Sequence, residues 1–468
     1  MLKRISYRDP DGYIIATDTS LYRIVYTSFQ EDLLLIEQNN LLADTRLVRH
    51  TKLDKEKVPR DLRDWLSQNE NESNILAIFQ IEKIFPISYA WEWTISMLKD
   101  AALLTLDLQR SLIPLGLTLK DANSYNIQFV NGKPVFIDLL SIKKEEVIYP
   151  WHAYGQFLRH FSFPLILAKY NKLGSMTILG SSYDGINKQN VSNLVPFRSY
   201  FNVYELLHVH LLRSLKEQRH TPKAKLSFTN QSEKALQLVS WNHSYISRSN
   251  IKQRDRSQSV WIDYVSDSVE KEYKTRKDEL LKNILSGLQP TQTGLDLGAN
   301  TGEYSELLLN YSNEVISLEE DSYCCEEIYK KISSQHDTTK KWMVINSNLL
   351  FPSPGLGWMN TEYKPLIERI SSSLVLSLAL IHHIYFKGSI YFDQIASLFN
   401  KITLDYLVVE FVSVEDDKVK ILKEQNSTRL ADYNMDNLIF ELSGYFSLLK
   451  TCPVNQTRTL LLFEKIKR

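Results

Sequence analysis

The chain has 468 residues, more than one ordinary core accommodates, so two or three domains are expected. An apolar fraction of 43% with 24% charged residues is typical of a globular protein that buries a sizeable core. The 55 basic residues are balanced by 55 acidic ones, which disfavours a nucleic-acid partner, because binding to a phosphate backbone needs a basic surplus.

Cysteine content and apolar runs limit the sites and locations to be expected. Only Cys324, Cys325 and Cys452 are present and no CxxC occurs, so we predict neither a disulfide framework nor a metal site. The location that we predict is a reducing cytoplasm. The polar N-terminus disfavours a secretory signal. The most apolar segments, 373–384 and 404–412, are shorter than the roughly 20 residues that a spanning helix needs, so no membrane span is expected.

The N-terminal half combines short strands with helices, which predicts an α+β domain. Its apolar spacing predicts a helix over 95–114. A polar loop over 120–126 comes next, and then two short strands, Ile127–Val130 and Pro134–Ile137. Asn131-Gly132 lies between these strands, and this dipeptide favours a tight hairpin turn.

The segment 213–256 is polar and basic, which is typical of a surface connection between domains. We therefore predict an N-terminal domain over 1–250, for recruiting or orienting a substrate, and a second domain over 260–468. A solvated linker is one interpretation of the segment, and a basic patch for an anionic substrate is the other.

After a predicted helix over 266–287, strands and helices alternate regularly. The strands are largely continuous apolar runs, as expected for parallel strands covered on both faces. They are predicted over 293–297, 314–319, 342–346, 373–380 and 405–411. The intervening or following helices are predicted over 303–310, 322–334, 363–370, 389–400 and 415–424. An antiparallel pair over 446–452 and 458–465 completes a doubly wound, Rossmann-like α/β sheet.

The loop after the first of these strands has unusual glycine content. The whole chain contains 15 glycines, yet Gly294, Gly298 and Gly302 lie within nine positions. Glycines at a strand-to-helix turn let the backbone approach a ligand closely beside a positive helix start. The spacing from Asp296 is DxGxxxG rather than the GxGxxG of dinucleotide sites, which favours a ligand with a zwitterionic amino-acid tail over a diphosphate.

Two polar residues follow the next strands. Glu319 ends the second strand, where a carboxylate can accept both ribose hydroxyls, and a solvated charge is the alternative interpretation. Asn348 follows the third strand, where its oxygen can accept from an adenine amine, or it could serve as a turn residue.

LDLGANTGEYS and EVISLEED resemble the first two motifs of class I S-adenosylmethionine-dependent methyltransferases. NSNLLFPSPGLGW, LVLSLALIHHI, VVEFVSVEDDKV and, in the N-terminal half, LKDANSYNIQFVNGKPVFIDLLS are similar to a bacterial family related to a rhizobial nodulation methyltransferase. The resemblance implies S-adenosylmethionine as the cofactor. It also implies that Asp296, Gly298 and Gly302 hold the methionine end, and Asn300 of the same loop is a further predicted cofactor-binding residue. Glu319 would hold the ribose, and Asn348 stands where many members carry an adenine-contacting Asp.

Methyl transfer from a sulfonium is an in-line displacement, so the enzyme contributes mainly positioning. A general base matters when the acceptor is a hydroxyl or a protonated amine. His382 and His383, at the end of the fourth strand, are the candidates because histidine titrates near neutral pH. We expect one of them to face the site and the other to pack. Glu410, at the end of the fifth strand, is a weaker candidate.

In the N-terminal half, Asp121, Asn126 and Asp138 have the spacing of a protein-kinase-like phosphotransferase core, in which Asn and the later Asp hold Mg²⁺. Leu119 stands where such enzymes carry a His, and Gly12 is the only glycine before residue 116, so a glycine-rich nucleotide loop is missing. Three interpretations remain open: turn and capping residues, a degenerate lobe, or an active phosphotransferase.

Together these features predict an S-adenosylmethionine-dependent methyltransferase. The expected acceptor is a glycan or a small-molecule hydroxyl, and the glycan part rests on analogy alone. The alternatives are a bifunctional phosphotransferase and methyltransferase, or a non-catalytic binding protein.

Overall fold

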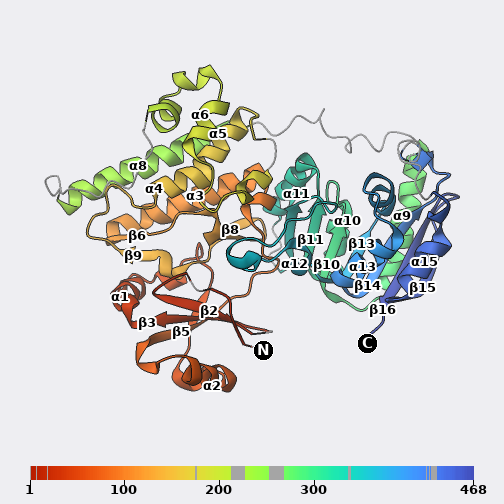
Figure 1. Ribbon diagram of the computed structural model, residues 1–468, viewed down its shortest axis with the longest axis horizontal. Coiled ribbons are helices and arrows are strands. Elements are labelled where there is room, and N and C mark those ends of the chain that lie inside the picture. Colours follow the sequence, from red (N-terminus) through yellow and green to blue (C-terminus); the bar gives the residue numbers. More distant parts are fainter. Residues whose placement is uncertain are drawn as a thin grey trace. The chain divides into compact units, whose positions relative to one another are not determined.

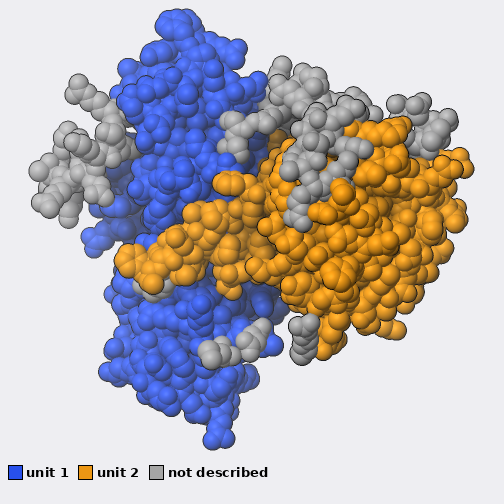
Figure 2. Space-filling view, turned by 45° about the vertical axis from the view of Figure 1, so that its right-hand side comes forward, with its two compact units in different colours: residues 1–252 blue, residues 253–468 orange. Residues whose placement is uncertain are grey.

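The computed structural model describes the chain except for residues 1, 7, 18, 174–175, 212–226, 252–267, 336–338, 418, 421, 423–429 and 468. The chain divides into two compact units, residues 1–252 and 253–468, coloured blue and orange in Figure 2. Each unit contains its own sheet (Figure 1). In the described part of the chain, no helix is both long and apolar enough to cross a membrane.

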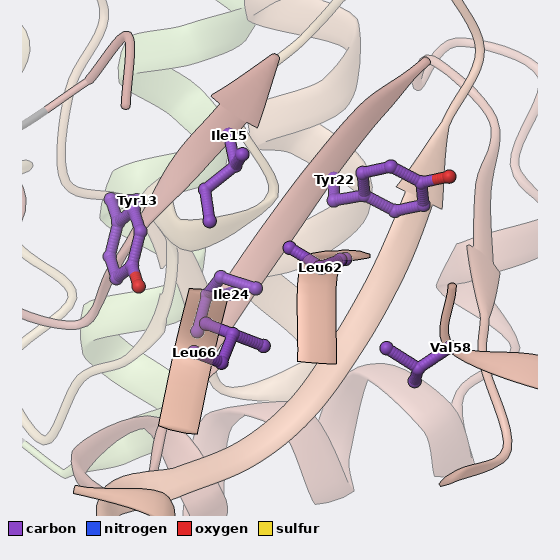
Figure 3. Close-up of a cluster of buried hydrophobic side chains, with 7 residues drawn as sticks. All are labelled: Tyr13, Ile15, Tyr22, Ile24, Val58, Leu62 and Leu66. Carbon is purple, nitrogen blue, oxygen red and sulfur yellow. The ribbon is translucent and has the colours of Figure 1, made fainter. Parts of the chain in front are cut away.

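The first unit begins with a five-stranded antiparallel sheet in the order β1-β2-β3-β5-β4. Its strands are β1 Lys3–Arg4, β2 Gly12–Ala16, β3 Leu21–Tyr26, β4 His50–Lys52 and β5 Ile75–Ile81. Alternate residues of a strand share a face, so one side of β2 and β3 presents apolar side chains to helix α2, Arg60–Asn69. This cluster is drawn in Figure 3 and comprises Tyr13, Ile15, Tyr22, Ile24, Val58, Leu62 and Leu66.

The rest of the first unit is mainly helical around α3, Ile95–Leu112, which begins at a side-chain cap supplied by Thr94. The other helices are α1 Gln30–Gln38, α4 Tyr154–Phe157, α5 Phe163–Lys169, α6 Lys188–Leu194, α7 Val203–Glu205 and α8 Phe228–Arg248. The short strands are β6 Leu117–Leu119, β7 Ile127–Val130, β8 Lys133–Phe136 and β9 Ile142–Lys144. The predicted hairpin is confirmed: β7 pairs with β8 around Asn131 and Gly132, both of which have positive φ.

The prediction of a linker over 213–256 is wrong for residues 228–248, which form α8 and pack against α3. The buried face of α8 contains Gln231 and Asn242 as well as aliphatic residues, so its composition resembles that of a surface segment. Residues 213–226 and 252–256 of the predicted linker lie outside the described part of the chain.

The second unit is built on a seven-stranded sheet in the order β12-β11-β10-β13-β14-β16-β15. Its strands are β10 Thr291–Leu297, β11 Ser312–Glu319, β12 Lys341–Asn346, β13 Ser372–Ser377, β14 Thr403–Val412, β15 Phe446–Pro453 and β16 Arg458–Lys465. The first five in chain order are parallel to one another, whereas β15 and β16 form the predicted antiparallel hairpin. The predicted Rossmann-like α/β fold is therefore confirmed.

The helices with described bounds in the second unit are α9 Ser268–Ser286, α10 Glu303–Leu308, α11 Ser322–Ser334, α12 Leu366–Arg369, α13 Phe392–Ile402 and α15 Met435–Ser443. The last five residues of β10 are consecutively buried, so both faces of this central strand are covered. The chain order reverses between β10 and β13, and ligands of open α/β sheets bind at such a switch point, beyond the carboxyl ends of the strands.

Candidate functional site

The loop from Asp296 to Gly302 connects β10 to α10 at the switch point. Three of its residues have left-handed backbone conformations: Gly298 at φ +70°, Asn300 at +49° and Gly302 at +80°. Glycine adopts this region without steric cost, and asparagine tolerates it better than most residues. The amide N–H groups of Gly298 and Ala299 both donate to the carbonyl oxygen of Leu318, at 2.9 and 3.1 Å, which ties the loop to β11.

The two glycines face different neighbours. A Cβ atom on Gly302 would lie 2.9 Å from Ile328 Cγ1 and 3.1 Å from Trp342 Cζ2, so this residue packs tightly against α11 and β12. A Cβ atom on Gly298 would lie 3.3 Å from Leu380 Cδ1. Gly298 therefore contacts the segment after β13, which also carries the two candidate histidines.

Glu319 lies at the carboxyl end of β11 and is buried. Its Oε2 accepts the N–H of Asn300 at 2.7 Å, and its Oε1 accepts the N–H of Asp321 at 2.8 Å. Burial raises the pKa of its carboxyl to about 7 despite these hydrogen bonds. A carboxylate has about four acceptor sites, so it retains capacity for a further donor such as a sugar hydroxyl. The residues present thus fit a ribose-bearing cofactor.

Asp296 is the penultimate residue of β10, and its side chain is buried. Its Oδ2 accepts the hydroxyl of Ser305 in α10 at 2.7 Å, and burial raises its pKa to about 6. The carboxylate thus holds the first turns of α10, which favours an indirect role in placing the loop. Direct contact of Asp296 with the methionine end remains a prediction.

Asn348 forms a turn after β12. Its Oδ1 accepts the N–H of Leu350 at 2.7 Å, and its Nδ2 donates to Glu320 Oε1 at 2.8 Å. These contacts match the turn residue considered above, and its contact with adenine remains a prediction.

The two candidate histidines lie beyond β13. The strand was predicted to continue to residue 380, but it ends at Ser377, because Ala379 has a φ of +51° and turns the chain. His382 and His383 therefore lie at the start of a π-helical turn over His383–Lys387, with ring centroids 4.2 Å apart. His382 is buried with 2% of its surface exposed, whereas His383 is partly exposed.

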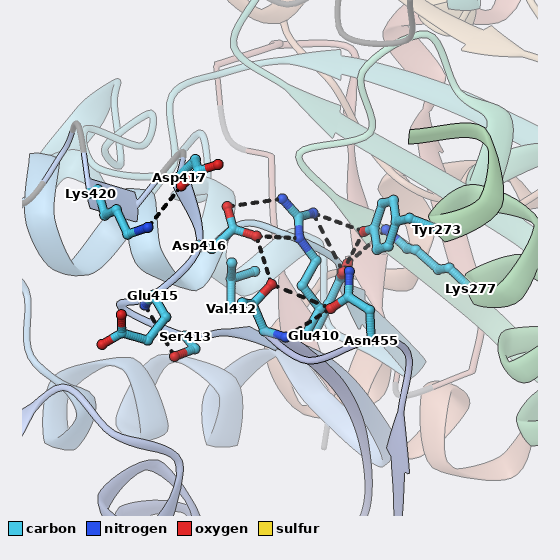
Figure 4. Close-up of polar contacts among 12 residues, drawn as sticks. Tyr273, Lys277, Glu410, Val412, Ser413, Glu415, Asp416, Asp417, Lys420 and Asn455 are labelled. Carbon is cyan, nitrogen blue, oxygen red and sulfur yellow. Dashed lines mark hydrogen bonds and ion pairs between the residues drawn. The ribbon is translucent and has the colours of Figure 1, made fainter. Parts of the chain in front are cut away.

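Glu410, the weaker candidate base, is fully buried near the carboxyl end of β14. Its Oε2 lies 2.7 Å from the ammonium of Lys277 in α9, and its Oε1 accepts the hydroxyl of Tyr273. Figure 4 shows this network extending toward Asp416, whose Oδ2 accepts Arg458 Nε at 2.8 Å. Because the carboxylate already has a cation and a hydroxyl as partners, it is poorly suited to act as a base.

The contacts of α9 were not foreseen from the sequence. Lys274 pairs with Glu303 at 2.7 Å, and Asp278 accepts the hydroxyl of Tyr304 at 3.0 Å, so α9 also holds the first turn of α10. One signal was available: Lys277 lies four residues before the buried Leu281, on the same face of the helix.

In the first unit, Asp138 follows the β7–β8 hairpin and forms an ion pair with Arg23 of β3 at 3.0 Å. Burial and the charge of Asp138 raise the pKa of Asp121. In the described part of the chain, no group of three or more His, Cys, Asp or Glu side chains could hold a metal ion. The kinase-like interpretation of Asp121, Asn126 and Asp138 remains a prediction.

Comparison with known proteins shows similarity to a nodulation protein along the whole chain. The nodulation protein NoeA of Rhizobium meliloti (strain 1021) is 26% identical over 475 residues, covering 98% of this chain and 95% of that protein. No family model matches this chain.

Solved structures with similarity to part of the chain include two methyltransferases. One is the magnesium protoporphyrin IX methyltransferase ChlM of Synechocystis PCC 6803, with 14% identity and a TM-score of 0.30 over 43% of this chain and 89% of that one. The other is the N-methyltransferase NodS of Bradyrhizobium japonicum WM9, with 10% identity and a TM-score of 0.30 over 42% of this chain and 98% of that one.

The strand order places a left-handed, glycine-containing loop at the switch point, and a buried carboxylate at the end of the neighbouring strand holds that loop. These are the features expected of a donor site for a nucleoside with an amino-acid tail. The chain is similar along its whole length to a nodulation protein, and its second unit has a doubly wound, Rossmann-like α/β fold with this loop at its switch point.

Proposed function

We propose that this chain is a class I S-adenosylmethionine-dependent methyltransferase that acts on a hydroxyl or amine of a small molecule or glycan, with the loop 296–302 as its donor site. S-Adenosylmethionine supplies an activated methyl group, and the residues of the chain bind and orient it. Gly298, Asn300 and Gly302 would hold the methionine end and Glu319 the ribose. The observation that carries this proposal is the buried Glu319 carboxylate, which is bound to the loop through Asn300.

Asn348 is the proposed adenine contact, and Asp296 would act by holding α10 beneath the loop. Neither residue needs to move for this, because each is already fixed by hydrogen bonds within the second unit. Pre-oriented groups of this kind lower the entropic cost of reaching an in-line geometry.

For proton transfer we favour His383 over His382. A side chain that exchanges a proton with an acceptor must be accessible to it, and His383 is partly exposed whereas His382 is buried. His382 would then position its neighbour through their ring contact. A base of this kind typically contributes about 10²–10⁴-fold to the rate. His383→Asn should therefore reduce transfer while leaving S-adenosylhomocysteine binding unchanged.

Charge argues against one class of acceptor, whereas the glycan part of the proposal rests on analogy alone. The balance of 55 basic and 55 acidic residues disfavours a polyanionic acceptor. The first unit, with its separate core, would recruit or orient the acceptor.

The proposal is tested by transfer of a tritiated methyl group to lysate fractions enriched in small molecules, polysaccharide, lipid, RNA or protein. We expect label in the small-molecule or polysaccharide fraction, and none with Gly298→Arg, which places a long side chain against Leu380. Label confined to RNA or protein would contradict the proposed acceptor class.

Two alternatives have distinct signatures. A phosphotransferase would bind Mg-ATP and lose that binding in Asp138→Ala, whereas the ion pair of Asp138 with Arg23 favours a structural role. In a non-catalytic binding protein, S-adenosylhomocysteine would not bind, or would bind equally well to Glu319→Ala.

A further inference from the structure

A buried chain of hydrogen bonds runs through the second unit toward the donor loop. The indole Nε1 of Trp342 donates to Ser317 Oγ at 2.8 Å. The Ser317 hydroxyl donates to Ser305 Oγ at 2.7 Å, and the Ser305 hydroxyl donates to Asp296 Oδ2 at 2.7 Å. The four residues come from β12, β11, α10 and β10, and each is buried.

The direction of this chain is fixed by its two ends. An indole N–H can only donate, and an ionised carboxylate can only accept. Ser317 accepts from Trp342 and so turns its own proton toward Ser305, which in turn donates to Asp296. Both hydroxyl rotors are therefore fixed in one orientation, and each hydrogen bond polarises the next.

The same indole also contacts the far end of the loop. Trp342 Cζ2 lies 3.1 Å from the position that a Cβ atom on Gly302 would occupy. Trp342 thus fixes both Asp296 and Gly302, the first and last residues of the loop. The indole donates toward one and packs against the other.

We propose that Ser305, Ser317 and Trp342 are positioning residues of the donor loop, which act on the cofactor through Asp296 and Gly302 without touching it. This inference rests on the proposed donor site at 296–302. Removal of these hydrogen bonds should loosen the Asp296 carboxylate and the first turn of α10. S-Adenosylhomocysteine should then bind more weakly than the loss of folding stability alone would explain.

Another serine of the same strand supplies a matched control. Ser312 lies on β11, as Ser317 does, and is equally buried, and its hydroxyl is hydrogen-bonded to Thr291 Oγ1 at 2.6 Å. It lies at the amino end of the strand, away from the donor loop. A purely structural buried serine should behave like Ser312.

Charged groups from other elements also act on Asp296. Lys277 of α9 lowers the pKa of Asp296, and this lysine is itself paired with Glu410 of β14 at 2.7 Å. Glu319 of β11 titrates in the same pH range. These groups are unchanged in the serine variants, so a change in pH profile between variants reports on the hydrogen-bond chain.

The test is calorimetric binding of S-adenosylhomocysteine together with thermal unfolding, on the full chain. Ser305→Ala should weaken binding about tenfold or more, since it removes a hydrogen bond to a buried charge. In this variant the loss of affinity on acidification should also begin at a higher pH than in wild type, because the Ser305 hydroxyl lowers the pKa of Asp296. Ser317→Ala should weaken binding several-fold, and Ser312→Ala should lower Tm with affinity within about twofold of wild type.

Equal affinities of the Ser317 and Ser312 variants would overturn the inference. If Ser305→Ala does not fold, Ser317→Ala decides, because it removes one buried hydroxyl from the hydrogen-bond network and Ser312→Ala removes one from the same strand outside that network. The affinity of Ser317→Ala should fall, and wild-type affinity would overturn the inference. Gly298→Arg tests the proposed donor site separately: if that variant binds as well as wild type, the proposed site fails whatever the serine variants do.

Discussion

At the scale of single residues, Gly302 offers the sharpest test of the donor loop. Alanine there must adopt a left-handed backbone and place its Cβ 2.9 Å from Ile328. Together these effects should lower the free energy of unfolding by about 2–4 kcal/mol. Urea denaturation measures this. Gly287→Ala is the control, because its Cβ would meet no atom closer than 3.5 Å, and equal losses in both variants would contradict the argument.

Glu319 makes a second residue-level prediction, on pH. Its pKa is about 7 in the folded chain, and ribose hydroxyls donate to the ionised form. Affinity for S-adenosylhomocysteine should therefore weaken as pH falls below 7, approaching tenfold per unit once the protonated form dominates. Glu319→Gln should bind more weakly but independently of pH between 6.5 and 8. If calorimetry shows that the affinity of the wild-type protein does not change between pH 6 and 8, this role of Glu319 is refuted.

The same pKa predicts how stability changes with pH. Because the folded pKa of Glu319 lies above its ordinary value of 4.5, the native state binds more protons than the unfolded state between these two pH values. The contribution of Glu319 to the free energy of unfolding is therefore fully present below pH 4.5 and is lost as pH rises through 7. The difference in free energy of unfolding between Glu319→Gln and wild type should therefore favour the variant more at pH 8 than at pH 5. Denaturation of both proteins at both pH values measures this difference.

At the scale of elements, α9 should depend on one buried ion pair. Lys277→Met removes the nearer cation of the fully buried Glu410 and leaves only Arg458, whose Nη1 lies 3.8 Å from Glu410 Oε1, which should cost about 3–5 kcal/mol in the free energy of unfolding. Adding Glu410→Gln should restore part of this. Lys274→Met is the matched control: its pair with Glu303 has the same 2.7 Å separation but is more exposed, so about 0–1 kcal/mol is expected. Similar losses from both lysine variants would contradict the prediction.

Helices and strands could be predicted from the sequence where their buried residues are apolar. The central parallel strands are continuous apolar runs, and their predicted bounds differ from the observed ones by one or two residues for β10, β11 and β12. Helix α8 was missed because its buried face includes Gln231 and Asn242. The end of β13 was misplaced because the left-handed Ala379 looks like one more apolar strand residue.

The candidate site follows the same rule. Gly298, Gly302 and Glu319 were identifiable because glycines and a carboxylate at strand ends depart from the local pattern. Ser305 and Ser317 were not, because ordinary polar residues acquire such a role only through tertiary contacts. Lys277 gave one signal, its place on the face of α9 that carries the buried Leu281.

At the scale of the whole molecule, every residue proposed for the donor site lies in the second unit, whose sheet, helices and buried core are its own. A fragment comprising residues 253–468 should therefore fold cooperatively and bind S-adenosylhomocysteine within about threefold of the full chain, a difference below about 0.7 kcal/mol. Methyl transfer should be lost or severely reduced, because the first unit is proposed to orient the acceptor. Calorimetry and the tritiated-methyl assay separate these effects. A folded fragment with more than tenfold weaker binding would place part of the donor site in the first unit, and a fragment with full transfer activity would remove the first unit from acceptor recognition.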